Sequence, residues 1–209
     1  DKTRLVAVTQ ASNTLGTRPD LKQIIGKAHA AGAVVVVDGC QGVVHGGADV
    51  KELDCDFYAF SGHKLYGPTG IGVLYGKREI LELMPPFLCG GDMVDRVSFA
   101  KTTYAPLPLK FEAGTANFIG AIGLGEAVNY LEKLDLRAVE QYEHKLTQYA
   151  TEKLSQIDGL RIYGVTEDKC SIVSFNVDGV HHYDLGMILD KLGIAIRTGQ
   201  HCAEPVMQH

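Results

Sequence analysis

Residues 61–72 read Ser-Gly-His-Lys-Leu-Tyr-Gly-Pro-Thr-Gly-Ile-Gly, which places a single lysine, Lys64, between a short apolar strand and a glycine-rich loop. A lysine amine is a nucleophile only when it is deprotonated, and burial or a nearby cation lowers its pKa toward that state. Glycine lets a backbone approach a bulky ligand closely, and proline stiffens that approach. The passage is suited to a lysine that forms a Schiff base with an aldehyde, although glycine and proline also mark ordinary surface turns.

A carboxylate follows the preceding apolar run. Asp38 comes directly after four valines, which predict a buried strand. Ligands of open α/β sheets bind outside the carboxyl ends of the strands, and a carboxylate buried there needs a partner. Two interpretations stay open for Asp38: the N-cap of a helix, or a salt bridge to a protonated heteroaromatic nitrogen. In the second, Gln41 would bond another substituent of the same ligand.

Strand and helix patterns alternate over the first eighty residues. Short apolar runs predict four strands, at Leu5–Thr9, 33–37, 57–60 and 71–75. Apolar residues at helical spacing predict a helix that begins at Pro19 and ends at Gly32. This order is typical of an α/β protein with a mostly parallel sheet.

The second half of the chain predicts different local structure. Pro85-Pro86 and Gly90-Gly91 interrupt any regular pattern, so residues 85–116 are expected to form a long loop. Two helices are expected over residues 117–156. A second βαβ-like set then follows, with strands at 160–163, 171–177 and 194–196 and a helix near 183–192. We expect two domain parts, residues 1–135 and 136–209.

Composition narrows the class of protein. The 209 residues are 45% hydrophobic and 22% charged, with a formal net charge of −5, and a pI near 5.9. A nucleic-acid-binding protein would normally carry a basic stripe, and no apolar run is long enough to cross a bilayer. The five cysteines form no C-x-x-C pair, which favours reduced, mostly buried cysteines in the cytoplasm.

Four motifs occur in one order along the chain. They are Val37-Asp38-Gly39-Cys40-Gln41, Ser61-Gly62-His63-Lys64, Phe111-Glu112-Ala113-Gly114-Thr115, and Arg197-Thr198-Gly199-Gln200-His201-Cys202-Ala203. Together these motifs resemble those of fold-type I pyridoxal phosphate enzymes of the class V aminotransferase-like family, and more narrowly those of the SUF-type (group II) cysteine desulfurases. The resemblance implies part of the family's large, mostly parallel-sheet domain plus part of its small carboxyl-terminal α/β domain.

The resemblance also assigns roles around pyridoxal 5'-phosphate. Lys64 becomes the Schiff-base lysine, and Asp38 keeps the pyridinium nitrogen protonated so that the ring can accept electrons. The remaining cofactor residues would be Gln41 at the phenolic oxygen and, at the phosphate, Ser61, His63 and Thr115. Thr115 would reach the phosphate of the neighbouring subunit, which implies a homodimer with its sites at the interface.

The reaction depends on Cys202. An average cysteine of this kind is a buried structural residue, but Arg197 and His201 supply positive potential that favours its thiolate. The resemblance implies that Lys64 acts as general base on Cα of L-cysteine and that Cys202 takes the sulfur as a persulfide, releasing L-alanine. Asn13 would help hold the substrate carboxylate. Arg197 would hold that carboxylate or anchor the loop.

The implied partners follow from the short cysteine loop. A short loop leaves a persulfide less mobile than a long one, so a sulfur-acceptor protein of the SUF system is expected, in iron–sulfur cluster assembly. Gln200 departs from the family, where a second histidine is common. The family's amino-terminal phosphate loop, its ring-stacking histidine and a carboxyl-terminal arginine are absent, so we expect an internal fragment that neither holds the cofactor tightly nor turns over by itself.

Three other functions compete with that of a cysteine desulfurase. A metal site would draw on histidines and Cys202, but adjacent histidines such as His181 and His182 rarely share one metal, and no standard zinc spacing is present. A non-catalytic binding module would leave Asp38, Lys64 and Cys202 without a common use. A selenocysteine lyase or another pyridoxal phosphate-dependent sulfur lyase remains the alternative within the enzymes.

Overall fold

The computed structural model describes residues 2–208, and internal contacts divide the chain into two compact units. Unit 1 holds the residues up to Val8 together with Lys22–Asp38 and Asp49–Lys133. Unit 2 holds Thr9–Leu21, Gly39–Ala48 and the residues from Leu134 onward. A domain boundary at residues 135 and 136 stays a prediction.

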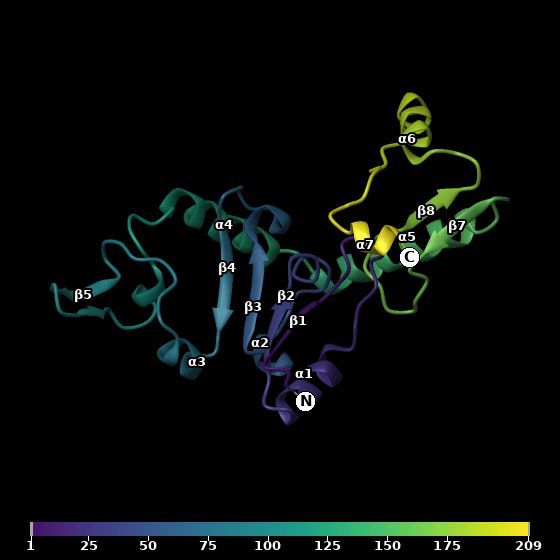
Figure 1. Ribbon diagram of the computed structural model, residues 1–209. Coiled ribbons are helices and arrows are strands. Elements are labelled where there is room, and N and C mark those ends of the chain that lie inside the picture. The colour runs from purple at the N-terminus through teal and green to yellow at the C-terminus, as the bar shows by residue number, and fades with distance from the viewer. Residues whose placement is uncertain (1, 209) are drawn as a thin grey trace. The chain divides into compact units, whose positions relative to one another are not determined.

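A four-stranded sheet forms the centre of unit 1, in the order β1-β2-β3-β4 (Figure 1). The strands are β1 (Leu5–Thr9), β2 (Val34–Asp38), β3 (Phe57–Ser61) and β4 (Gly72–Gly76), so all four predicted strands are confirmed. β2 and β3 pair in parallel, whereas β3 and β4 are antiparallel. The expected α/β sheet is therefore mixed, with β4 as an antiparallel strand at the end of the order. The short link after β3 explains this, because a parallel return needs a crossover of about a dozen residues or more.

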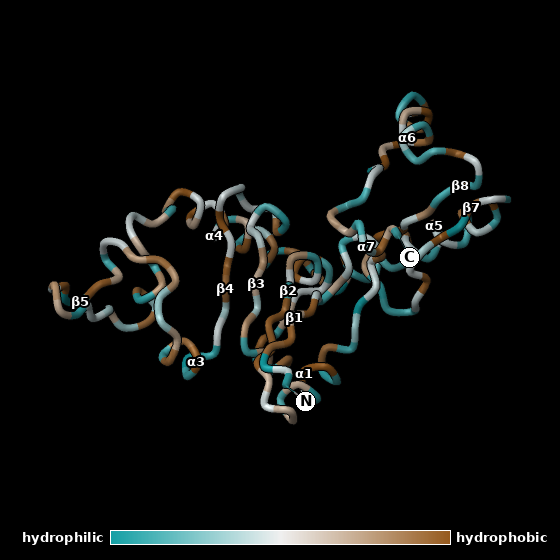
Figure 2. Tube along the Cα trace, viewed as in Figure 1, coloured by the Kyte–Doolittle hydropathy of each residue, from teal (hydrophilic) through white to brown (hydrophobic). Residues whose placement is uncertain are grey.

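The core of unit 1 gathers on β2 and on the start of β3. Val35 and Val37 are fully buried, and Phe57 and Tyr58 are nearly so. Figure 2 shows hydrophobic residues concentrated along β1 and β2. Helix α1 (Leu21–Ala30) contributes the buried side chain of Ile25. It begins two residues after Pro19, and a glycine at φ 71° follows its end, as expected for Gly32.

Residues 85–116 are more regular than the sequence predicts. They contain the antiparallel strands β5 (Val94–Val97) and β6 (Thr102–Tyr104) and the short helix η2 (Leu109–Phe111). Their strands of four and three residues are too short to give a periodic pattern, and their side chains are half-buried or exposed. Two further helices, α2 (Val50–Leu53) and α3 (Arg78–Leu83), complete the short elements of this unit.

The two predicted long helices are confirmed as α4 (Phe118–Leu131) and α5 (Leu136–Leu154). In unit 2, β7 (Leu160–Tyr163) pairs antiparallel with β8 (Ser174–Val177). These are the first two strands of the predicted βαβ-like set, which is wrong only in its last strand. Helix α6 (His182–Lys191) is found as predicted, and α7 (Glu204–Met207) follows. The structure gives no strand at residues 194–196, since a ladder needs a partner strand as well as an apolar run.

The five cysteines are free thiols. Cys55 and Cys170 are buried as expected, but Cys40 is half-buried, and Cys89 and Cys202 are exposed. No helix within residues 2–208 combines the length and the apolar character that a membrane span requires. Within the same range, no three His, Cys, Asp or Glu side chains gather in a way that could hold a metal ion.

Candidate functional site

Lys64 lies in a tight turn directly after β3. Ser61 is the last residue of that strand, and residues 62–65 form the 3-10 helix η1 (Gly62–Leu65). The Gly62 N–H donates to the Ile71 carbonyl at 2.9 Å, and the Gly67 N–H donates to the Gly62 carbonyl at 2.9 Å. These two bonds close the loop on itself and hold the half-buried Lys64 at the end of the strand.

Two glycines of this loop lie where a side chain does not fit. A Cβ added at Gly62 would lie 2.9 Å from Ile71 Cγ2, and one added at Gly67 would lie 2.9 Å from Leu124 Cδ1 of α4. Pro68 packs against the same helix, since a Cβ at Gly123 would lie 3.1 Å from its Cγ. The glycines therefore permit close packing of the lysine turn against α4, in addition to any role toward a ligand.

Asp38 and the lysine turn share one edge of the sheet. Because β2 and β3 are parallel, with Asp38 paired to Ala59, their carboxyl ends meet at that edge. The alternative of Asp38 as a helix N-cap is wrong: the residues after it form turns, and the next helix, α2, is capped by Asp49. The structure therefore brings together Asp38, Ser61, His63 and Lys64 from two neighbouring strand ends.

Ser61 and His63 are already in contact. Ser61 Oγ lies 2.8 Å from His63 Nδ1, which places a hydroxyl and an imidazole next to each other beside Lys64. Hydroxyl and imidazole donors suit an anion, an amine suits an aldehyde, and a carboxylate suits a protonated ring nitrogen. This donor set fits a ligand that carries a phosphate, an aldehyde and a basic ring.

Thr115 lies between η2 and α4 and is exposed. It follows Gly114, whose φ is 79°, a value that favours glycine. Two residues later, Asn117 caps α4: its Oδ1 accepts from the Gly120 N–H, and its Nδ2 donates to the Gly70 carbonyl at 3.0 Å. Asn117 thus ties the start of α4 to the glycine loop after Lys64. The sequence analysis did not single it out, although asparagine before a helical pattern is an N-cap signal.

The predicted residues Asn13, Gln41, Arg197 and Cys202 lie in unit 2. Gln41 is half-buried in a turn, and Arg197 is exposed. Cys202 and the preceding His201 both have left-handed backbones, with φ values of 57° and 51°. Asn13 Nδ2 donates to the His201 carbonyl at 2.6 Å. Asn13 therefore lies beside the turn formed by residues 200–203, which is called the cysteine turn below. No Asn-Gly signal in the sequence predicts such a turn.

A second cluster in unit 2 surrounds Arg18, which the sequence analysis did not single out. Its guanidinium donates to Cys170 Sγ at 3.4 Å and to Glu140 at 3.2 Å, and it pairs with Asp168 at 3.4 Å. It also donates to the His45 carbonyl. Burial raises the pKa of the Cys170 thiol, against the lowering effect of Arg18. A buried thiol of raised pKa is inert, so the cluster is structural.

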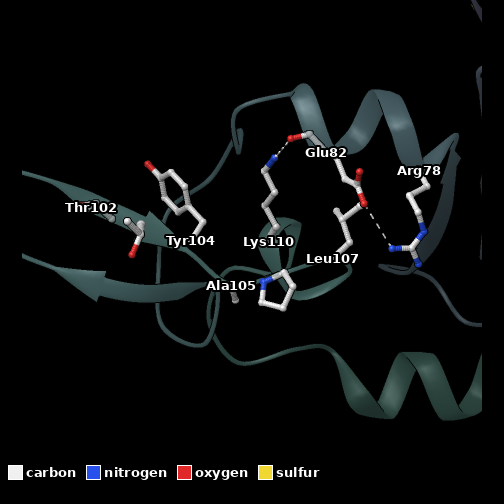
Figure 3. Close-up of a pocket in the computed structure, with 9 residues that line it drawn as sticks. Arg78, Glu82, Thr102, Tyr104, Ala105, Leu107 and Lys110 are labelled. Atoms are coloured by element: carbon white, nitrogen blue, oxygen red, sulfur yellow. Dashed lines mark hydrogen bonds and ion pairs between the residues drawn. The ribbon is translucent and has the colours of Figure 1, made fainter.

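A pocket of about 480 Å³ lies in unit 1 among α3, β6 and η2 (Figure 3). Lys110 donates to the Leu81 and Glu82 carbonyls at 3.0 and 2.9 Å, and Arg78 pairs with Glu82 at 3.6 Å. Lys110 thereby satisfies carbonyls at the end of α3. None of the predicted site residues lines this pocket.

Known proteins provide an independent comparison. The family described as Aminotransferase class-V matches residues 1–209. A cysteine desulfurase of Yersinia pestis (strain Pestoides F) is 53% identical over 99% of this chain and 51% of its own length. The chain therefore spans about half the length of the curated relatives it matches.

Solved structures agree with this comparison. The cysteine desulfurase CsdA (S-sulfonic acid) from Escherichia coli matches with a TM-score of 0.92 and 50% identity, over 97% of this chain and 50% of that one. The apo cysteine desulfurase from Thermococcus onnurineus NA1 matches with a TM-score of 0.93 and 42% identity, over 98% and 52%.

Proposed function

The chain belongs to the aminotransferase class-V family, and from this premise we propose that the full-length protein is a pyridoxal phosphate-dependent cysteine desulfurase. The fold of this chain is part of the fold-type I fold of such enzymes. The proposed reaction converts L-cysteine to L-alanine and leaves the sulfur as a persulfide on Cys202. The identity of 53% to a cysteine desulfurase, over 99% of the chain, supports this choice.

One observation carries the proposal. The parallel pairing of β2 and β3 sets Asp38 and the lysine turn at the same edge of one sheet. A carboxylate, a reactive amine and two anion donors at that edge match the donors that pyridoxal phosphate requires. A non-catalytic module would have no use for this set.

The cofactor residues follow from the donor set. When bound, pyridoxal phosphate supplies an aldehyde that takes up the substrate amino group and a ring that withdraws electrons from Cα. Lys64 Nζ would hold that aldehyde in the absence of substrate, and Asp38 would hold a proton at the ring nitrogen. The other proposed contacts are Gln41 to the phenolic oxygen and, to the phosphate, Ser61, His63 and, from the neighbouring subunit, Thr115.

After the substrate has bound, the reaction uses three steps of ordinary acid–base and thiol chemistry. Asn13 and Arg197 hold the substrate carboxylate, and Lys64 removes the proton from Cα. Cys202 thiolate attacks the substrate sulfur: the S–S bond forms, the C–S bond breaks, and its electron pair stays with the former substrate. The carbon that carried the sulfur takes up the proton that the Cys202 thiol lost on forming its thiolate, and Lys64 returns the removed proton to Cα, which yields alanine. In the overall reaction, L-cysteine and the Cys202 thiol give L-alanine and the Cys202 persulfide.

The finer proposals concern subtype and partners. We propose the SUF-type (group II) subtype, on the short Arg197–Ala203 motif quoted above, with a sulfur-acceptor protein that receives the persulfide for iron–sulfur cluster assembly. A homodimer, a cytoplasmic location and a domain boundary at 135/136 belong to the same proposal. Gln200 stands where many relatives have histidine, so the proposal assigns it no proton transfer.

Alanine release by the full-length protein tests the proposal. Wild type should convert L-cysteine to L-alanine, and Lys64→Ala and Cys202→Ser should each abolish that activity. Cys89→Ser is the matched control, because Cys89 is also an exposed free thiol, and it should retain activity. Full L-cysteine activity in Cys202→Ser would contradict the desulfurase and favour the alternative of a sulfur lyase that needs no thiol.

A further inference from the structure

The cysteine turn has an unfavourable backbone. Gln200 to Ala203 form a β-turn closed by the Ala203 N–H donating to the Gln200 carbonyl at 2.8 Å. Both central residues, His201 and Cys202, have positive φ, as in a type I′ turn. Such turns prefer Asn and Gly, and a left-handed backbone costs other residues about 1–2 kcal/mol each. The turn therefore needs support from its surroundings.

On the carboxyl side, the residues that the structure describes form α7, a helix of four residues whose N-cap Ala203 offers no side-chain hydrogen bond. The Val206 and Met207 N–H groups donate to the Ala203 carbonyl. These bonds fix the end of the turn but leave the His201 carbonyl untouched.

Asn13 supplies a bond to that carbonyl. Its Nδ2 lies 2.6 Å from the His201 oxygen, across 188 residues of sequence. A carbonyl only accepts, so the amide must present its nitrogen, and this nitrogen carries two protons. One proton serves His201, and the second is available to a substrate carboxylate.

Asn13 itself is firmly placed. Ser12 Oγ accepts from the Thr14 and Leu15 N–H groups at 3.3 and 3.0 Å. The Thr14 carbonyl accepts from Ser174 Oγ, and the Gly16 carbonyl accepts from the Cys170 N–H at 2.8 Å. The segment that carries Asn13 is thus tied to the start of β8, so its side chain can hold the turn at His201 and Cys202 in place.

We propose that Asn13 is a positioning residue for Cys202, holding the left-handed His201–Cys202 turn through the His201 carbonyl so that Sγ is presented for sulfur transfer. This role rests on the proposed function and adds to the substrate contact proposed for Asn13. A carboxylate contact alone acts on KM. A positioning role acts on the rate of sulfur transfer at saturating L-cysteine.

The test uses the full-length holoenzyme and its Asn13→Ala variant. Two rates are compared: exchange of the Cα proton of L-alanine with deuterated water, which needs Lys64 but not Cys202, and single-turnover sulfur transfer to Cys202 at saturating L-cysteine. Positioning predicts that sulfur transfer falls at least tenfold more than exchange. An effect confined to KM, with the saturating transfer rate of wild type, would overturn the proposal.

A double-variant cycle tests whether Asn13 acts by supporting the left-handed backbone of the cysteine turn. Glycine adopts positive φ without cost, so in a His201→Gly background the Asn13→Ala change should slow transfer at most threefold. Both proteins in this comparison, His201→Gly and the double variant, lack the imidazole, so its loss does not affect the ratio of their rates. An undiminished Asn13→Ala effect in that background would show that the turn is not what Asn13 supports.

A readout without turnover separates this proposal from the proposed function. Without substrate, the rate at which iodoacetamide alkylates Cys202 should differ at least threefold between Asn13→Ala and wild type, with Cys89 as internal reference. Equal Cys202 rates would overturn the positioning role. A wild type that shows neither exchange nor transfer, while alkylation still responds to Asn13→Ala, would refute the proposed function alone. If Asn13→Ala folds poorly, Asn13→Ser takes its place in all measurements.

Discussion

Ser61 Oγ lies 2.8 Å from His63 Nδ1, across the one residue that separates the end of β3 from the imidazole. The contact orients the two donors beside Lys64. Preorganised donors lower the cost of ordering side chains when an anion binds. The pair is the part of the cofactor site that the local structure builds most directly.

Ser61→Ala should weaken the binding of pyridoxal phosphate to the full-length protein. It removes a donor to a charged group, which is worth about 1.5–3 kcal/mol, or a roughly 10- to 100-fold rise in Kd. Titration of the cofactor-free protein measures this. Ser155→Ala is the control, since that hydroxyl bonds only the end of α5 at the Glu152 carbonyl. Equal Kd values for both variants would remove Ser61 from the site.

Gly62→Ala should destabilise the protein. The added methyl would lie 2.9 Å from Ile71 Cγ2 and 3.0 Å from the Ile71 carbonyl oxygen, and overpacking of this kind costs about 1–3 kcal/mol. Gly125→Ala in α4 is the matched change, because nothing lies within 4 Å of its added methyl. Helix propensity predicts that it stabilises by up to about 1 kcal/mol. Denaturant unfolding of the cofactor-free, full-length variants gives both values, and a neutral Gly62→Ala would refute the packing argument.

Gly186→Ala should disturb the cysteine loop from its other side. A methyl at Gly186 in α6 would lie 2.6 Å from Thr198 Cγ2, so Thr198 must move, and it stands four residues before Cys202. Sulfur transfer to Cys202 should fall about 3- to 10-fold, on the scale of 1 kcal/mol of strain. Thr198→Ser removes the clashing methyl and should restore the rate in the double variant. A double variant as slow as Gly186→Ala would show that another contact causes the loss.

Asp56 should make the stability of unit 1 sensitive to acid. Burial would raise the pKa of this carboxyl, but hydrogen bonds from the Val35 N–H, His29 and Lys77 outweigh burial and lower the pKa. The distances are 2.7, 2.9 and 3.1 Å, and Asp54 also contacts Lys77 and His29. A lowered pKa means that the contribution is complete above the unfolded value of about 3.9 and is lost as the pH falls below it.

Asp56→Asn should therefore cost about 1–3 kcal/mol of the free energy of unfolding at pH 7 and less near pH 3. Unfolding of the full-length protein at both pH values measures the difference. Asp158→Asn, at an exposed carboxylate, should change neither value. Parallel pH profiles for wild type and Asp56→Asn would contradict the role of this carboxylate.

Much of the secondary structure can be predicted from local sequence patterns of apolar residues. The four-valine run predicts β2 and places Asp38 at its end, and the helical spacing of apolar residues predicts α1, α4 and α5. Strand direction is not local: the apolar run of β4 reads the same either way, and only the short link after β3 makes it antiparallel. The sequence pattern does not predict the hairpin of β5 and β6, because its strands are short and largely exposed.

The site divides in the same way. Lys64, Asp38, Ser61 and His63 stand out by residue type and by position at strand ends. The contact of Asn13 with His201 joins residues 188 positions apart, and no pattern along the sequence encodes it. The sequence likewise does not predict the left-handed turn at Cys202, since neither of its central residues is Gly or Asn.

The central claim is that Cys202 receives the sulfur of L-cysteine. Mass spectrometry of the full-length protein after one turnover with L-cysteine carrying a heavy sulfur isotope tests it directly. We predict one labelled sulfur on the Cys202 peptide, formed at least as fast as alanine, removed by a reductant, and absent from Cys89 and from Lys64→Ala. Alanine that forms while Cys202 stays unlabelled would contradict the account.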